Sequence, residues 1–282
     1  MIFWKCTECD EVNSYPEHKE CQTCGERIEA TQMEHIKFYQ FYIDRANSGD
    51  MYAAVELFKL YTAGEHLEKN VDEGIKWLTL AAENNNGLAQ YEMGKLYFFD
   101  KGIFERDDKK AYAWFKRSAE NNYPYAGHYI AQCHLEGAGV PEDQKKGFEL
   151  FLENANVGVP ESQEKVAFCY MFGVGVEKNP QKAFYWYRRA ADMDSISDRG
   201  ALRLACYYYQ GEVVERDDNE ASKWFEQAYR GGNQVAGYYL AEIFLSIDNP
   251  TTQGAARNIL KQVAESNDEE ASNMAKELLR KF

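Results

Sequence analysis

One position recurs along this chain at a nearly constant interval, and that interval limits the possible folds more than any other feature. A ring-bearing residue occupies it six times, with separations of 36, 37, 36, 38 and 36 residues: Tyr61, Tyr97, His134, Tyr170, Tyr208 and Phe244. A small residue lies eight positions before each ring, and an apolar residue lies four positions before it. Positions spaced by four and eight share one face of an α-helix, so every unit is predicted to contain a packed helix.

A second helix is predicted about 16 residues after each ring. Bulky anchors occupy that position, and alanines follow most of them by about one helical turn: Trp77, Trp114, Phe151, Trp186, Trp224 and Leu260. Glycine-rich turns separate the two helices, most clearly at 136–141 and 172–176, and Asp107, Asp143 and Asn179 are expected N-caps. Paired helices at this period predict an all-α fold, a right-handed α-α solenoid of about six helix-pair repeats.

The segment 162–191 carries the pattern most completely, in the residues Tyr170, Gly175, Val176, Lys182, Ala183, Trp186, Ala190 and Ala191. This pattern resembles the SEL-one-like repeat family, a relative of tetratricopeptide repeats, over residues 51–268. The six expected units are 51–86, 87–122, 123–159, 160–197, 198–233 and 234–268. Capping helices are expected at 29–50 and 269–282. The resemblance implies a scaffold, a signalling adaptor or a secreted bacterial effector, and the sequence does not choose among these.

Four of the seven cysteines form two CxxC pairs near the N-terminus: Cys6, Cys9, Cys21 and Cys24. Two such pairs can close a tetrahedral thiolate site, so residues 1–28 are predicted to be a small module with one structural zinc ion per chain. A redox dithiol, an iron site or a degenerate site are the alternatives.

With Trp4 and Asn13, the four cysteines resemble the Ran-binding-protein-type zinc finger and the broader zinc-ribbon class. That resemblance implies a small β module. Members of the finger family bind ubiquitin or single-stranded RNA. This sequence has Asp10 and Glu11 where the ubiquitin-binding members carry Thr-Phe, which puts that role in doubt.

The charge balance bears on the choice of partner. The formal net charge is −14, and residues 1–28 contain three basic and six acidic side chains. The alternative hypothesis is a nucleic-acid-associated zinc-finger protein. Both charge values argue against a nucleic-acid partner. No window is long and apolar enough for membrane insertion, and the N-terminus has no apolar signal core. A cytoplasmic location is therefore expected, with non-Sec export as an effector left open.

Motifs for catalysis are sparse, and the chain is predicted not to be an enzyme. The segment Ser162-Gln163-Glu164-Lys165 matches the S-x-x-K motif of penicillin-recognising enzymes. Cysteine-rich relatives of the repeat family have been linked to penicillin binding, so a β-lactam-recognising hydrolase is a further alternative. However, Ser162 occupies the small-residue position of its repeat, which packing alone explains.

The first helix of each pair is expected to line a concave groove, as in tetratricopeptide repeats. Positions nine, six and two residues before the recurring ring would then face a protein or peptide partner. The predicted groove residues are Tyr52, Lys59, Tyr91, Lys95, Tyr125, His128, Phe168 and Tyr238. Aromatic rings beside cations are typical interface anchors. The alternative for some of these tyrosines is a place in the seam between repeats. The sequence thus predicts a non-catalytic adaptor with the zinc module as an accessory contact.

Overall fold

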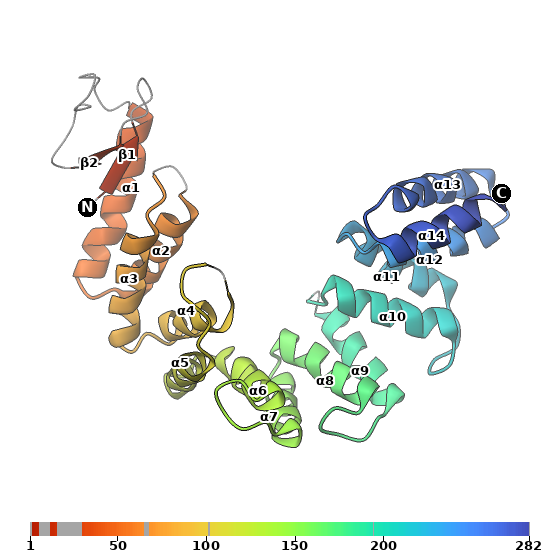
Figure 1. The fold of residues 1–282 in the computed structure, drawn as a ribbon, viewed down its shortest axis with the longest axis horizontal. Helices are drawn as coiled ribbons and strands as arrows, with labels where there is room; N and C mark the ends of the chain where they lie inside the picture. Colours follow the sequence, from red (N-terminus) through yellow and green to blue (C-terminus); the bar gives the residue numbers. More distant parts are fainter. Residues whose placement is uncertain are drawn as a thin grey trace. The chain divides into compact units, whose positions relative to one another are not determined.

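A computed structural model describes residues 2–5, 12–15, 30–64, 68–100, 102–193 and 195–281. The predicted zinc ligands Cys6, Cys9, Cys21 and Cys24 lie outside this part of the chain. The chain divides into two compact units, Met1–Glu142 and Asp143–Phe282. Within each unit, successive helices lie side by side as antiparallel neighbours (Figure 1).

The first unit begins with two short strands, β1 (Ile2–Lys5) and β2 (Val12–Tyr15), which pair antiparallel with Ile2 opposite Tyr15. Strand β1 lies beside the first helix (Figure 1). The helices of this unit are α1 (Ala30–Asn47), α2 (Met51–Ala63), α3 (Val71–Glu83), α4 (Gly87–Phe98), α5 (Asp108–Glu120) and α6 (Ala126–Glu136). Helix α1 falls inside the segment 29–50 that the sequence predicts as a cap.

The second unit is entirely helical in its described residues. Its helices are α7 (Gln144–Asn156), α8 (Pro160–Phe172), α9 (Pro180–Asp192), α10 (Asp198–Gln210), α11 (Asp218–Arg230), α12 (Gln234–Ser246), α13 (Pro250–Ala264) and α14 (Glu269–Leu279). From α2 onward the helices follow the predicted order of first and second helices in each repeat. The prediction of an all-α helical-repeat fold is therefore confirmed.

Local sequence signals account for the helix ends. The side chains of Asp107, Asp143 and Asn179 accept hydrogen bonds from backbone N–H groups in the first turns of α5, α7 and α9, as the sequence predicts. The loop of the fourth repeat then packs tightly on a neighbouring helix. A Cβ atom at Gly175 would lie 2.0 Å from the carbonyl oxygen of Gln144, and φ there is +68°. Only glycine fits this close approach.

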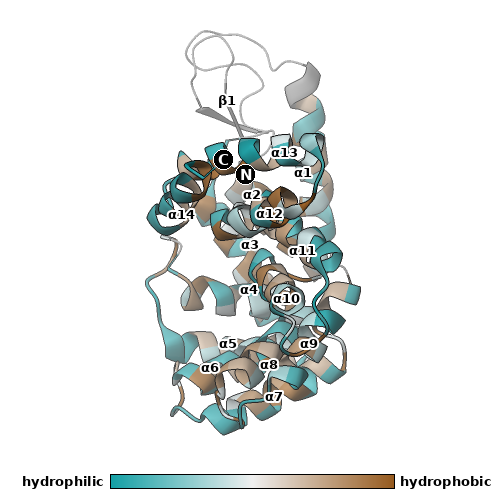
Figure 2. Ribbon diagram, turned by 90° about the vertical axis from the view of Figure 1, so that its right-hand side faces the viewer, coloured by the Kyte–Doolittle hydropathy of each residue, from teal (hydrophilic) through white to brown (hydrophobic). Residues whose placement is uncertain are grey.

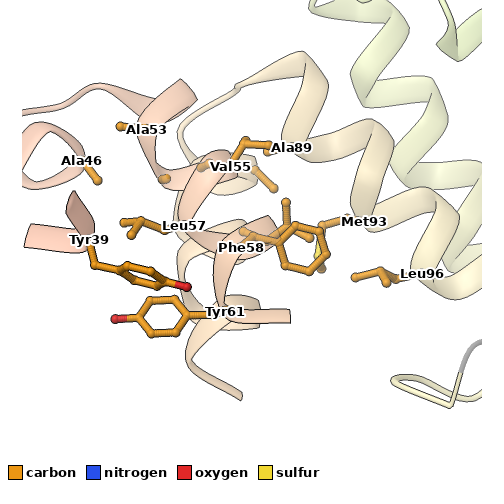
Figure 3. Packing of buried hydrophobic residues seen from close by; sticks show 14 of the residues in the cluster. Tyr39, Ala46, Ala53, Val55, Leu57, Phe58, Tyr61, Ala89, Met93 and Leu96 are labelled. Atoms are coloured by element: carbon orange, nitrogen blue, oxygen red, sulfur yellow. The ribbon is translucent and has the colours of Figure 1, made fainter. Parts of the chain in front are cut away.

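Buried side chains fill the space between neighbouring helices. In Figure 3, Tyr39 of α1 and Tyr61 of α2 meet edge to face with ring centroids 5.2 Å apart. The Tyr39 hydroxyl donates to the carbonyl oxygen of Leu60 at 3.1 Å. Across α2, Phe58 packs toward Met93 of α4 (Figure 3). The buried cluster at the start of the first unit is therefore built from both helices of a pair and from the next pair.

The helices carry both polar and apolar positions. Brown hydrophobic and teal hydrophilic positions occur on the same helices in Figure 2. In α11 the buried residues recur at helical spacing: Ala221, Trp224, Phe225 and Ala228. Within the described ranges, no helix combines the length and apolar character that crossing a bilayer requires.

Candidate functional site

Three of the predicted groove residues lie in packed seams. Tyr91 of α4 contacts the rings of Tyr123 and Tyr129, with centroids 4.9 and 5.5 Å away. Burial raises the pKa of the Tyr91 hydroxyl. His128 is only 8% exposed and lies edge to face against Tyr129, while Tyr238 packs against the last helices of the second unit. Tyr91 and Tyr238 therefore contribute to packing between helices, and His128 is buried, which leaves little of these rings for a partner.

The predicted cations of the first two repeats are paired within their own helices. The Lys59 amine lies 2.7 Å from a carboxylate oxygen of Glu56, and that of Lys95 lies 3.1 Å from Glu92. The Lys95 amine also lies 5.0 Å from the centre of the Tyr91 ring. These pairs reduce the positive charge that this part of the face offers to a partner.

Two predicted tyrosines of the first unit are open to solvent. Tyr52, in the first turn of α2, is 68% exposed. Tyr125 precedes α6 and keeps its ring 5.7 Å from that of Tyr123. They lie in different repeats, and no cavity among those found in the described part of this unit is lined by either ring.

A cleft between α8 and α10 brings exposed rings and cations together. Phe168 and Phe172 of α8 are 41% and 51% exposed, and their ring centroids are 4.7 Å apart. The Arg203 guanidinium of α10 lies 5.8 Å from the centre of the Phe172 ring. The cavity beside them has a volume of about 420 Å³, within the range of ligand pockets. It is lined by Met171, Phe172, Lys178, Pro180, Gln181, Arg203, Cys206, Tyr207, Gln210, Glu212 and Val213.

Further cations extend this α8–α10 cleft along both helices. Lys165 lies one turn before Phe168, and Arg199 lies one turn before Arg203. Among the described residues of the second unit, none of these three cations forms an ion pair. Sequence reasoning identified Phe168 but missed Phe172 and Arg203. Their signal is helical spacing, because each lies four residues from another exposed position on the same helix face.

The remaining thiols are free. Cys133 and Cys169 are buried, and burial raises their pKa values to about 12 and about 11. Cys206 is half-buried and lines the α8–α10 cleft. Burial raises the pKa of Cys206, and the nearby Arg203 partly offsets that rise. All three thiols are therefore predominantly protonated near neutral pH and are poor nucleophiles.

The S-x-x-K segment does not form an accessible catalytic pair. Ser162 is fully buried in α8 at 0% exposure, whereas Lys165 is only half-buried on the same helix. A β-lactam ring could not reach the Ser162 hydroxyl without opening the helix packing. The described residues also contain no group of three His, Cys, Asp or Glu side chains placed to hold a metal ion.

Comparison with known proteins identifies the repeat. The Sel1 repeat model matches residues 52–86, 87–123, 124–155, 160–195 and 199–233. The matched segments end before the sixth helix pair, α12 and α13, whose connecting loop lacks the glycine-rich turn. No curated protein matches the chain significantly.

Two solved structures share the fold. A protective antigen of uropathogenic Escherichia coli strains, described as displaying an SLR fold, has a TM-score of 0.69 and 25% identity over 83% of this chain. The match covers 50% of that antigen, so this chain spans about half its length. A Sel1 repeat protein from Oxalobacter formigenes has a TM-score of 0.66 and 22% identity, over 88% of this chain and 96% of its own. Because the repeat model matches more than half of the sequence and the helix pairs follow its period, the chain belongs to the Sel1 repeat family.

Proposed function

We propose that this protein is a non-catalytic adaptor that binds a segment of a partner protein in the α8–α10 cleft. The observation that carries the proposal is a pair of exposed, touching rings, Phe168 and Phe172. Phe172 lies beside the Arg203 guanidinium and lines a cavity of about 420 Å³. Exposed aromatic rings bordered by arginine are the residues that most often dominate protein interfaces. Helical solenoids of this kind bind partners through an extended face formed by successive repeats.

The surroundings of the cleft support binding rather than chemistry. The cleft thiol Cys206 is kept protonated by burial, and the Ser162 hydroxyl is inaccessible. The net charge of −14 disfavours a nucleic-acid partner over the whole molecule. Family membership points the same way, since Sel1-type repeats typically mediate protein–protein interaction.

Affinity capture from native cell extract tests this proposal. The wild type would be compared with the double variant Phe168→Ala/Phe172→Ala and with Tyr185→Ala, a matched control that removes an exposed ring from α9. We expect a dominant partner that is lost in the double variant and retained in the control. A partner retained by the double variant would place recognition elsewhere. RNA recovered in place of protein, with steep salt dependence, would contradict the adaptor function.

The proposal includes one structural zinc ion held by Cys6, Cys9, Cys21 and Cys24. Its support is the ligand spacing in the sequence, together with the antiparallel pair β1 and β2, whose strands flank residues 6–11. Bound zinc would fix a module that is too small to build its own core. Elemental analysis should give one zinc per chain in the wild type and none in Cys6→Ser, with the helical signal largely kept. Iron, or no metal, in the wild type would contradict it.

Deletion of residues 1–28 separates the module from the cleft. If the partner is lost in the deletion and retained by Phe168→Ala/Phe172→Ala, the module is the recognition element. If the partner is retained in the deletion, the module serves the stability of the array. Thermal unfolding of the deletion variant would then be expected to shift to lower temperature.

A further inference from the structure

We infer that the α8–α10 cleft takes an acidic peptide segment carrying an aromatic or aliphatic side chain between its carboxylates. This inference rests on the proposed adaptor function and adds the chemistry of the ligand. It needs two matched features in the cleft, an apolar surface for the anchor side chain and a surplus of cations for the flanking charges.

The apolar feature is formed by rings that the fold leaves open. Phe168 and Phe172 stand one turn apart on α8 and touch each other, while Tyr207 and Cys206 line the opposite wall on α10. An apolar side chain in the cavity would remove the Phe172 ring from water, and a ligand that continues along α8 would also cover Phe168. This burial is the main source of binding free energy at such a site. The cavity has room for one or two side chains rather than for a folded domain.

The cationic feature lies on the rim of the same cavity. Lys178 and Arg203 line it against the single acid Glu212. Lys165 and Arg199 continue the cationic rows on α8 and α10. The acids of that stretch are Glu161, Asp198 and Glu164, and the Glu164 carboxylate is hydrogen-bonded to Ser197. At the cavity itself two cations therefore face one acid, although the chain as a whole is strongly acidic with a net charge of −14. Positive potential confined to one cleft of an acidic protein attracts anionic groups to that cleft and repels cationic ones.

The cations are also free to act on a ligand. In the described residues of this unit, Lys165, Arg199 and Arg203 make no ion pair. The Arg203 guanidinium rests over the Phe172 ring, which holds it at the cavity while its N–H groups remain available. A planar guanidinium can bind a carboxylate through two parallel hydrogen bonds. The anchor and the carboxylate of one peptide could thus be held by adjacent residues of the cleft.

The equivalent place in the second repeat lacks this chemistry. Glu92 stands where the fourth repeat has Lys165, and Lys95 stands where it has Phe168. Glu92 and Lys95 pair with each other at 3.1 Å. The same helix position is therefore self-neutralised in one repeat and open to an anion in the other, so the ligand class is a property of this cleft and not of the repeat in general.

A selection from a random phage-displayed peptide library on the full-length chain tests the inference. Enrichment of acidic peptides with an aromatic or aliphatic residue, lost when Arg199→Gln/Arg203→Gln is used as bait, is the expected result. Enrichment of basic or neutral peptides that is lost in Phe168→Ala/Phe172→Ala would overturn the ligand class while leaving the adaptor function intact. Peptides that bind both variants equally, or no enrichment, would count against both.

A selected peptide would then be labelled and titrated by fluorescence anisotropy. We expect Arg203→Gln to weaken binding about tenfold and Lys223→Gln, a matched cation over the Trp224 ring on α11, to leave it unchanged. Replacing the carboxylates of the peptide by amides should abolish the effect of Arg203→Gln. Equal weakening by both protein variants would overturn the inference, because it would indicate general electrostatics.

Cys206 gives a second readout that does not depend on the variants folding well. Alkylation of this half-buried thiol, followed by mass spectrometry, should slow when the peptide fills the cleft. The buried Cys133 and Cys169 serve as internal controls for global unfolding. Unchanged alkylation of Cys206 at saturating peptide would place the ligand elsewhere and overturn the inference.

Discussion

The second and fourth repeats share a backbone plan but differ in how they join the next repeat. In the second repeat, Tyr91 packs with Tyr123, Tyr129 and Phe115, and the joint is made of rings. In the fourth repeat, Glu164 occupies the place of Tyr91. Its carboxylate accepts hydrogen bonds from the backbone N–H and the hydroxyl of Ser197, the latter at 2.6 Å.

This difference decides which rings a partner can reach. The second repeat directs its aromatic residues into the joint and covers the adjacent face with the Glu92–Lys95 ion pair. In the fourth repeat, helix α8 contacts its neighbour through the polar Glu164–Ser197 pair and leaves Phe168 and Phe172 exposed. The rings at this joint come from α9 instead, where Phe184 and Tyr187 contact Tyr207 of α10. An aromatic residue on the first helix of a repeat is therefore informative about binding only after the joint has been assigned.

The aromatic joint should be the more sensitive of the two to truncation. Phe115 is fully buried and stacks on Tyr129 with centroids 4.8 Å apart, so Phe115→Ala should lower the free energy of unfolding by about 3–5 kcal/mol. Urea denaturation followed by far-UV circular dichroism would measure it. The exposed ring variant Tyr185→Ala is the control and should change stability little. A loss below about 1 kcal/mol for Phe115→Ala would show that the joint tolerates the cavity.

Truncating the polar contact between Glu164 and Ser197 should lower the free energy of unfolding by less than Phe115→Ala does. Glu164→Ala removes both acceptors from Ser197, the N-cap of α10, and should cost about 1–2 kcal/mol. A double-mutant cycle with Ser197→Ala should show coupling between the two positions. Glu161→Ala, on the exposed side of the same helix, should be neutral. Additive effects of Glu164→Ala and Ser197→Ala would remove the contrast between the two joints.

A smaller difference concerns a buried glutamine that both repeats carry. Gln90 donates to the carbonyl oxygen of Ala82, and its own Oε1 accepts from the Asn121 amide at 2.9 Å. Gln163 donates to Ala155 in the same way, but Met193 stands in place of Asn121. The Oε1 of Gln163 has no hydrogen-bond partner in the part of the chain that the structure describes.

Met193→Asn should supply the missing donor. The backbone angles at Met193 (φ −97°, ψ 11°) are close to those at Asn121 (φ −92°, ψ 22°), so the new amide can adopt the same position. We expect a gain of about 1 kcal/mol in the free energy of unfolding. Met193→Ala, which supplies no donor, should give no gain, and the reverse change Asn121→Met should destabilise the second repeat by a similar amount. Equal behaviour of Asn and Ala at 193 would contradict the explanation.

Local signals made the helix pairs predictable from sequence. Which face of each first helix is exposed to a partner depends on tertiary packing and was harder to predict. The recurring ring, the N-caps at Asp107 and Asn179, and the glycine turns act within a few residues, so the helix pairs could be placed from sequence. The orientation of each first helix is a different matter, because one residue corresponds to a rotation of about 100°. The sequence assigned positions six before the ring to the groove, whereas the structure places Tyr91 there in a seam.

The residues that line the cleft stand at other positions of the repeat. Arg203 lies five residues before the ring of the fifth repeat, and Phe172 lies two residues after the ring of the fourth. Single-residue registers of this kind follow from how neighbouring repeats pack, and that packing differs between Tyr91 and Glu164 at the same position. No local pattern distinguishes the two cases. The spacing of exposed residues along α8 and α10 is the signal that could have found the cleft.

The smallest expected effect gives the sharpest contrast between the two faces. Lys95 pairs with Glu92 and lies over the Tyr91 ring, so Lys95→Ala should cost about 0.5 kcal/mol of stability. It should leave partner binding unchanged, because the amine is already engaged within its own helix. Phe168→Ala, at the matching position of the fourth repeat, should do the opposite, since an exposed ring contributes little to folding and much to an interface.

Thermal unfolding would measure the stability of both variants, and fluorescence anisotropy would measure their binding to the partner peptide. If Lys95→Ala weakened binding as much as Phe168→Ala, the partner would engage both faces, and recognition would have to be assigned to the array rather than to the α8–α10 cleft.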